Sequence, residues 1–156
     1  MIRAPFLIAA ASAAIAALLS TAFAEPAKFG TAAEAKAMLE KAVIAVKADK
    51  AKALASFNAG TDGFKDRDLQ AFCWDIKSGD MLASTVLSNV TNHKNQCEQV
   101  DKNGKAFGKE QCAVAVEGKF VEVSYMFPRP GETEPTAKVS YITRVGDLGC
   151  GVGYYK

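Results

Sequence analysis

The sequence contains very little of what catalytic and metal sites usually require. Histidine occurs once, at His93, in a polar stretch, and no nucleophile motif surrounds any serine. Nucleophilic triads need a base beside the nucleophile, and zinc sites normally cluster thiols and imidazoles, whereas no C-x-x-C pair is present. Asp66 and Asp68 are close in sequence, but their i and i+2 positions before a strand favour a solvated loop. We therefore expect no enzyme, no metal site and no cofactor.

An excess of charge of one sign is also missing. The chain has 19 basic and 17 acidic side chains, and lysine and glutamate are interspersed along it. Proteins that bind phosphate backbones concentrate positive charge on one surface. We therefore do not expect a nucleic acid as a partner.

Long apolar runs are confined to the start of the chain. Arg3 precedes an apolar run over residues 6–19, and Ala22-Phe23-Ala24 gives the small-x-small pattern of a signal peptidase site. This run is shorter than the roughly 20 residues that a membrane-spanning helix needs. We predict that residues 1–24 are a secretory signal peptide. Residues 25–156 then form one soluble domain, periplasmic or secreted, with no membrane span after cleavage.

The predicted mature chain contains four cysteines. They are Cys73, Cys97, Cys112 and Cys150. An even number of cysteines in an oxidising compartment predicts two disulfides, for which three pairings exist.

The first part of the mature chain has a helical pattern. Thr31 and Glu34 have the spacing of a capping box. Over residues 32–57, apolar residues recur every three or four positions, and lysines occupy the other side. The turn residues Asn58-Ala59-Gly60 follow. We predict one long amphipathic helix over residues 32–57.

After Gly63 the pattern changes to that of strands. We predict strands over residues 69–76, 81–87, 119–127, 138–145 and 148–155. A turn over residues 77–80 makes the first two strands a hairpin. Residues 89–105 are polar and irregular, residues 107–116 can form a short helix, and residues 128–135 form a proline-rich loop. This order predicts an α+β domain in which the long helix packs on a five-stranded antiparallel sheet.

Two motifs resemble nucleotide and calcium sites without meeting their requirements. A phosphate-binding glycine loop must open a helix, whereas Gly149, Gly151 and Gly153 lie in the last strand. Alternate glycines there indicate room for a close neighbour on one face of the strand. The segment 101–105 lacks the later ligands of a calcium loop, and we interpret it as a turn.

Aromatic and basic residues gather on the third and fourth predicted strands and on the loop between them. They are Tyr125, Phe127, Arg129, Lys138, Tyr141 and Arg144. Pockets for small anions combine apolar walls with a few well-placed donors. An ordinary core with exposed basic residues would give the same pattern, so these residues alone leave both interpretations open.

Several segments resemble the bacterial single-Cache family of extracytoplasmic sensor domains. They are residues 63–69 leading into Phe72, then 101–105, 107–110, 120–128, 135–141 and the ending Gly-Val-Gly-Tyr-Tyr-Lys at 151–156. The resemblance covers the predicted mature chain in order. It implies a PAS-like antiparallel sheet behind a long N-terminal helix. It also implies a pocket, between the sheet and the polar segments that cross it, for small molecules that are often carboxylates.

The resemblance also implies particular roles for residues. In a PAS-like sheet the first and last strands are central neighbours, which implies a Cys73–Cys150 disulfide and leaves Cys97 to pair with Cys112. The implied ligand-binding residues are Trp74, Tyr125, Phe127 and Tyr141 as walls, with Lys138 or Arg129 meeting the charge. Where the family usually has a His-Pro pair, this chain has Ser84-Thr85.

Two functions follow from this resemblance. In the first, the domain binds or senses a small organic anion in the periplasm. In the second, the pocket is vestigial, and the domain is an interaction partner of a membrane receptor or another envelope protein.

Overall fold

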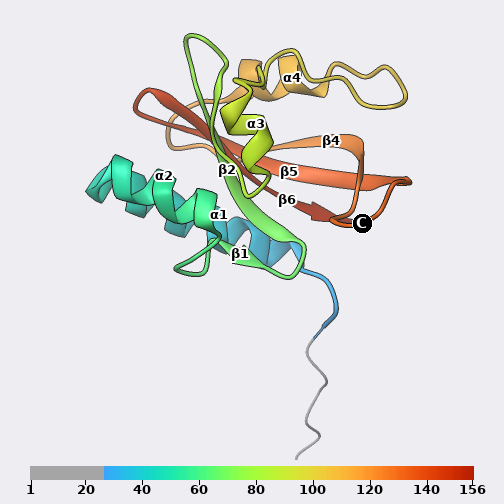
Figure 1. The fold of residues 1–156 in the computed structure, drawn as a ribbon, viewed down its shortest axis with the longest axis horizontal. Coiled ribbons are helices and arrows are strands. Elements are labelled where there is room, and N and C mark those ends of the chain that lie inside the picture. The colour runs from blue at the N-terminus through green and yellow to red at the C-terminus, as the bar shows by residue number, and fades with distance from the viewer. Residues whose placement is uncertain (1–26) are drawn as a thin grey trace, which may run out of the picture.

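The computed structural model describes residues 27–156, so the predicted signal peptide lies outside the described residues. The elements are α1 (Ala32–Ala48), α2 (Lys50–Ala59), β1 (Lys65–Asp66), β2 (Leu69–Asp75), β3 (Met81–Ala83), α3 (Leu87–Thr91), α4 (Phe107–Val114), β4 (Val121–Pro128), β5 (Pro135–Val145) and β6 (Leu148–Tyr155) (Figure 1). Within this part of the chain, none of the helices combines the length and the apolar character that crossing a membrane requires.

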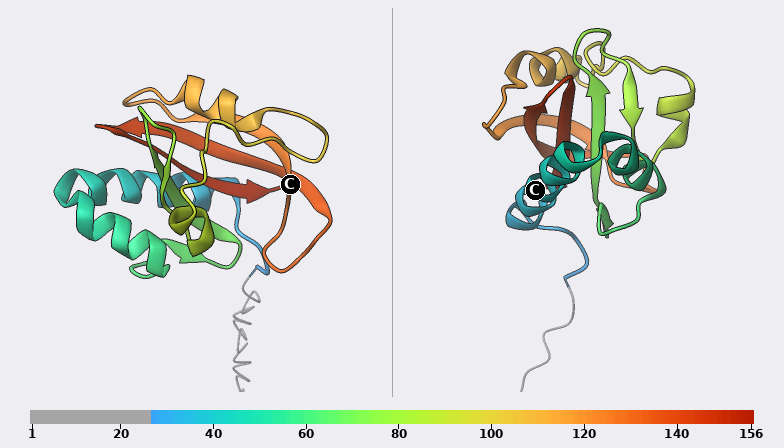
Figure 2. Two further views of the ribbon diagram at one scale, coloured as in Figure 1. Left: turned by 45° about the horizontal axis from the view of Figure 1, so that its top comes forward. Right: turned by 90° about the vertical axis from the view of Figure 1, so that its left-hand side faces the viewer.

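The long N-terminal helix is present as α1, but the bounds that we predicted for it, residues 32–57, are wrong, because the helix is interrupted at Asp49. The capping box of Thr31 and Glu34 starts α1 as expected. Asp49 adopts an extended conformation, with φ −157° and ψ 97°, and its side chain accepts a hydrogen bond from the backbone N–H of Lys52. An aspartate that caps a helix in this way starts a new one. Helix α2 therefore folds back beside α1 (Figure 2).

The sheet has the PAS-like order that the resemblance implied. Its strands follow the order β1-β2-β6-β5-β4, all antiparallel, and β3 pairs with β2. All five predicted strands are present, and the two-residue β1 is added to them. The second predicted strand is much shorter than expected. At the end of β3, the side chain of Asn58 donates a hydrogen bond to the carbonyl oxygen of Leu82 and accepts one from the backbone N–H of Ser84. The pairing of β3 with β2 stops here, and α3 follows.

Two apolar cores lie on the two faces of this sheet. Helices α1 and α2 cover one face and α4 covers part of the other (Figure 2). As expected, the alternate glycines of β6 leave room for close neighbours, which lie on the sheet face that α4 covers. A Cβ atom at Gly149 would collide with the Trp74 ring, and one at Gly151 would collide with Phe72. These glycines therefore let large side chains of β2 lie directly on β6.

The two disulfides join the cysteines as the resemblance implied. Cys73 and Cys150 face one another on β2 and β6, with an S–S distance of 2.08 Å. Cys97 and Cys112 tie the irregular segment before α4 to that helix. The first bond links the two central strands, and the second fixes the segment that crosses the sheet.

Candidate functional site

The face of the sheet opposite α1 carries two neighbouring cavities. The first cavity has a volume of about 70 Å³ and is lined by Gln70, Phe72, Met81, Ser84, Asn89, Lys94, Gln96, Gln99, Phe107, Tyr125, Phe127 and Lys138. The second has a volume of about 360 Å³ and is lined by Lys65, Arg67, Asp68, Leu69, Gln70, Thr85, Val86, Phe127, Pro128, Arg129, Pro130, Gly131, Lys138 and Tyr155. Three residues line both cavities, which therefore share a wall.

Lys138 is the central residue of this shared wall. It is only 8% exposed, and its Nζ donates a hydrogen bond to the Tyr155 hydroxyl at 3.2 Å. The Nζ also lies 4.6 Å from the centre of the Tyr155 ring and 5.2 Å from that of Phe127. Within residues 27–156, no carboxylate lies at ion-pairing distance from this ammonium group.

The surroundings of Lys138 disfavour its charge. Burial lowers the pKa of Lys138 from 10.5 to about 8, and the positive charge of Arg129 acts in the same direction, while the negative charge of Asp68 opposes the shift. Burying a charge without a counter-ion is unfavourable unless other groups solvate it. Lys138 is therefore a buried cation that has a hydroxyl group, but no carboxylate, as its hydrogen-bond acceptor.

Arg129, by contrast, is fully paired. Its Nη1 donates to Oδ2 of Asp68 at 2.7 Å, and the two side chains are 13% and 6% exposed. The other oxygen of Asp68 accepts the backbone N–H of Gly30 at 2.7 Å. The Arg129 guanidinium also lies over the rings of Phe29 and Tyr155, 3.9 and 4.5 Å from their centres. The solvated loop that we predicted for Asp68 is therefore wrong: this carboxylate is buried in an ion pair.

Two tyrosines of this face keep their protons. Tyr155 donates to the carbonyl oxygen of Pro128 at 2.6 Å, and burial raises its pKa above the usual range. The Tyr125 ring stacks on Phe107 at a centroid distance of 4.2 Å, and its hydroxyl lies 2.8 Å from the Ser140 hydroxyl. Burial raises the pKa of Tyr125 to about 12. Both phenols are thus neutral hydrogen-bonding groups at physiological pH.

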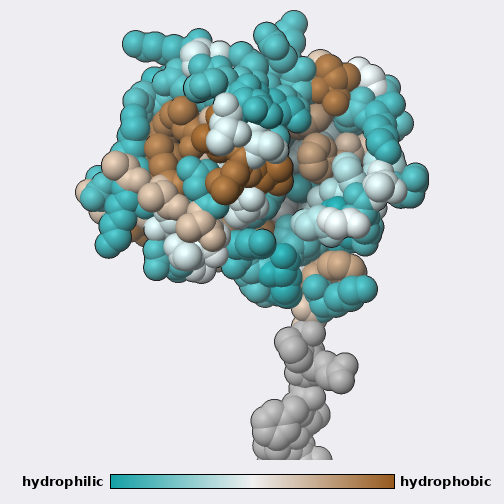
Figure 3. All heavy atoms as spheres, viewed as in Figure 1, coloured by the Kyte–Doolittle hydropathy of each residue, from teal (hydrophilic) through white to brown (hydrophobic). Residues whose placement is uncertain are grey.

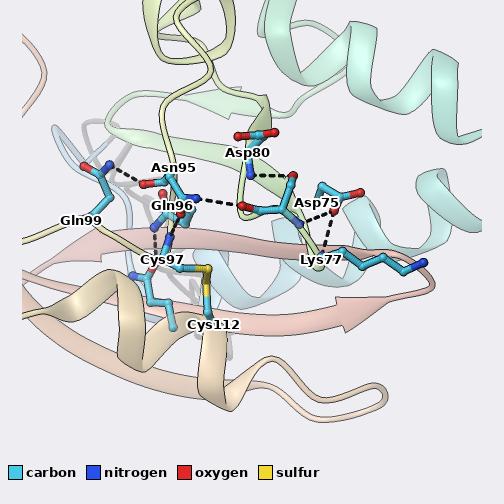
Figure 4. The surroundings of a disulfide bond; sticks show 10 residues. Asp75, Lys77, Asp80, Asn95, Gln96, Cys97, Gln99 and Cys112 are labelled. Carbon is cyan, nitrogen blue, oxygen red and sulfur yellow. Dashed lines mark hydrogen bonds between the residues drawn. A yellow bond between two sulfur atoms is a disulfide. The ribbon is translucent and has the colours of Figure 1, made fainter.

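The polar segment over the first cavity is held from both sides. Gln96 donates to Oε1 of Gln111 in α4 at 2.6 Å, and Asn95 donates to the carbonyl oxygen of Ser78 in the β2–β3 turn at 2.8 Å. Figure 4 shows these bonds around the Cys97–Cys112 disulfide. The side chain of Gln96, which lines this cavity, is therefore held by a residue outside it.

Comparison with known families identifies this architecture. A family described as the Cache domain matches residues 34–156. The chain belongs to the Cache domain family. Cache domains are extracytoplasmic sensor modules rather than enzymes, which confirms the expected absence of catalysis. The two disulfides fit a location outside the cytoplasm.

Solved structures of other proteins share this fold. A methyl-accepting chemotaxis protein from Vibrio parahaemolyticus RIMD 2210633 superposes with a TM-score of 0.61 at 20% identity, covering 79% of this chain and 86% of that one. A periplasmic sensor domain of a chemotaxis protein gives 0.52 at 20% identity, covering 77% and 86%. A Cache chemosensory domain described by its recognition of carboxylic acids gives 0.51 at 19% identity, covering 77% and 84%. No curated protein matches the sequence.

The Cache fold brings together four of the six residues expected to bind a ligand. Tyr125, Phe127 and Lys138 line the first cavity, and Arg129 lines the second together with Phe127 and Lys138. Trp74 lies fully buried behind the cavities, stacked on Phe72. Tyr141 lies on the opposite face, where it packs on Tyr154.

Several lining residues of this Cache domain were missed from the sequence. Gln70 and Phe72 alternate with the buried residues of β2, so the period of that strand could have placed them on the cavity face. Tyr155 lies two residues after Gly153, so it falls on the face of β6 that the alternate glycines mark. Gln96 and Gln99 carry no such signal, because they come from an irregular segment whose path depends on tertiary contacts.

Proposed function

We propose that this Cache domain is a periplasmic receptor that binds a small organic anion in the cavities around Lys138. The observation that carries this proposal is the buried ammonium of Lys138, which faces both cavities with a hydroxyl as its hydrogen-bond acceptor. An anionic ligand would supply the missing counter-ion. It would also gain from the low polarity of the site, since charge pairs interact more strongly away from water.

The surroundings of Lys138 suit such a ligand. The second cavity is within the size range of small-molecule sites, which combine apolar walls with a few polar groups. Phe127 and Tyr155 supply the walls, and Gln70 supplies an amide. A structurally similar Cache domain is described as recognising carboxylic acids, and this supports carboxylates as the first ligands to test.

A thermal-shift screen of the mature chain with organic acids tests this proposal. A ligand at 100 times its dissociation constant stabilises a protein by about 2.7 kcal/mol, which raises the melting temperature by several degrees. Lys138→Met should abolish the shift. Lys36→Met, which removes an exposed lysine of α1 on the far side of the sheet, is the matched control and should keep it.

Two results would contradict the proposal. One is the absence of a shift with every organic anion tested. The other is an undiminished shift in the Lys138→Met variant, because the anion would then bind elsewhere on the protein.

A specific observation also favours the second function, that of a partner for a membrane receptor or envelope protein. Val86 and Leu87 are 48% and 55% exposed, and apolar side chains gather on the face where α3 lies (Figure 3). Contiguous apolar surface of this kind often marks a contact site. If this function holds, no anion shifts the melting temperature, and replacing both residues with serine abolishes co-purification of an envelope protein.

A further inference from the structure

Three ionised side chains make up the inner charge of the site. Lys138 and Arg129 are cations, and Asp68 is an anion that lies 2.7 Å from Arg129. All three are largely shielded from water, and all three line the second cavity. Asp68 also influences Lys138, because its charge favours the ammonium form. The inner net charge is therefore +1.

The other cations of the cavity walls contribute little to this balance. Arg67 is already paired, with its Nη2 at 2.6 Å from both Glu34 and Asp66. Lys65 and Lys94 are exposed at the outside of the cavities, where water and salt screen their charge. The inner three groups thus decide which charge a buried ligand should carry.

We propose that Asp68 determines specificity by limiting the site to singly charged anions, such as monocarboxylates, and excluding dicarboxylates. This inference rests on the proposed function. A single carboxylate neutralises Lys138 and leaves the inner site with no net charge. A second carboxylate would enter beside Asp68 with no free cation, and it would lose its hydration without a counter-ion. Asp68 is well placed for this role because Arg129 and the N–H of Gly30 hold both of its oxygens.

Calorimetric titration with propionate and succinate at pH 7.5 tests the inference, because succinate then carries both charges. Three forms of the mature protein separate the effect of the inner charge from the effect of a change in cavity shape. The wild type has an inner charge of +1, Asp68→Asn raises it to +2, and the double variant Asp68→Asn/Arg129→Gln returns it to +1. Asparagine keeps an oxygen for the Gly30 N–H.

The expected preferences follow from the charges. Unit charges about 7 Å apart, at an effective dielectric of about 20, change a binding constant by roughly tenfold to a hundredfold. The wild type should bind propionate at least about tenfold more tightly than succinate. Asp68→Asn should improve succinate binding at least about tenfold, and the double variant should return to the wild-type preference.

Several results would overturn the inference. Equal binding of succinate and propionate by the wild type would do so while leaving the proposed function intact. The same holds if Asp68→Asn leaves their ratio unchanged, or if the double variant keeps the ratio of Asp68→Asn. If no anion binds the wild type, the proposed function itself fails, and this inference fails with it.

A further variant covers the case in which Asp68→Asn does not fold. Arg129→Gln lowers the inner charge to zero while Lys138 stays in place. Its affinity for propionate should fall at least about tenfold, and circular dichroism should show an intact fold. Unchanged propionate affinity in this variant would contradict the inference.

Discussion

Replacing Lys138 with methionine should make the unliganded protein more stable at neutral pH. The pKa of Lys138 falls from 10.5 to about 8 on folding. A tenfold change in an acid dissociation constant corresponds to about 1.4 kcal/mol, so the buried ammonium destabilises the folded state by about 3 kcal/mol. Methionine has a similar length and no charge. The lost hydrogen bond to Tyr155 offsets about 1 kcal/mol, which leaves an expected gain of roughly 1–3 kcal/mol.

The lowered pKa of Lys138 also determines how the stability difference between the variant and the wild type changes with pH. Below pH 8 the lysine is protonated in both the folded and unfolded states, so the full cost is present. Between pH 8 and 10.5 the unfolded chain holds the proton and the folded protein does not, so the free energy of unfolding of the wild type rises with pH. The advantage of Lys138→Met should therefore shrink steadily above pH 8.

Urea unfolding of both proteins at pH 7, 8 and 9.5, with the disulfides intact, measures this difference. Taking the difference between variant and wild type cancels the titration of the other lysines and tyrosines. Lys36→Met, at an exposed position of α1, should show no such trend. A Lys138→Met variant that is less stable than the wild type at pH 7, or whose advantage does not change with pH, would refute the reasoning.

Three further predictions concern the site and its support. Anion affinity should fall roughly tenfold for each pH unit above about 8, where Lys138 loses its proton, and constant affinity up to pH 9.5 in calorimetric titration would contradict this. Gly149→Ala should cost about 1–3 kcal/mol and change the fluorescence of Trp74, because its Cβ would collide with that ring. Replacing Cys97 and Cys112, which are 15 residues apart, with alanine should lower stability in denaturant by about 3 kcal/mol and weaken anion binding. Unchanged binding would show that this tether does not position the first cavity.

The sheet could be predicted from the sequence because its signals are local. Strict alternation in β4 put Val123 and Tyr125 on one buried face, and the alternate glycines of β6 indicated a close neighbour. The order of the strands is not local information. It came from the resemblance to the Cache family, which implied that β2 and β6 are neighbours and so which cysteines pair.

The site was harder to predict because its contacts join distant parts of the chain. Asp68 meets Arg129 across 61 residues, and nothing around Asp68 in the sequence distinguishes it from its solvated neighbour Asp66.

The interruption of the helix at Asp49 also depends on contacts between distant parts of the chain. Apolar spacing continues through Asp49 because α1 and α2 both bury a stripe against the same core, so periodicity alone could not show that the chain turns back there.

The buried ammonium group of Lys138 lowers the stability of the fold, and the Cys73–Cys150 disulfide, which lines neither cavity, acts against that loss. The lysine sits on β5 opposite Tyr155 of β6, and β6 is joined to β2 by the Cys73–Cys150 bond. A buried charge without a partner favours any motion that lets water reach it. The Cys73–Cys150 bond joins β6, the strand that carries Tyr155, to β2 and thereby restricts such motion.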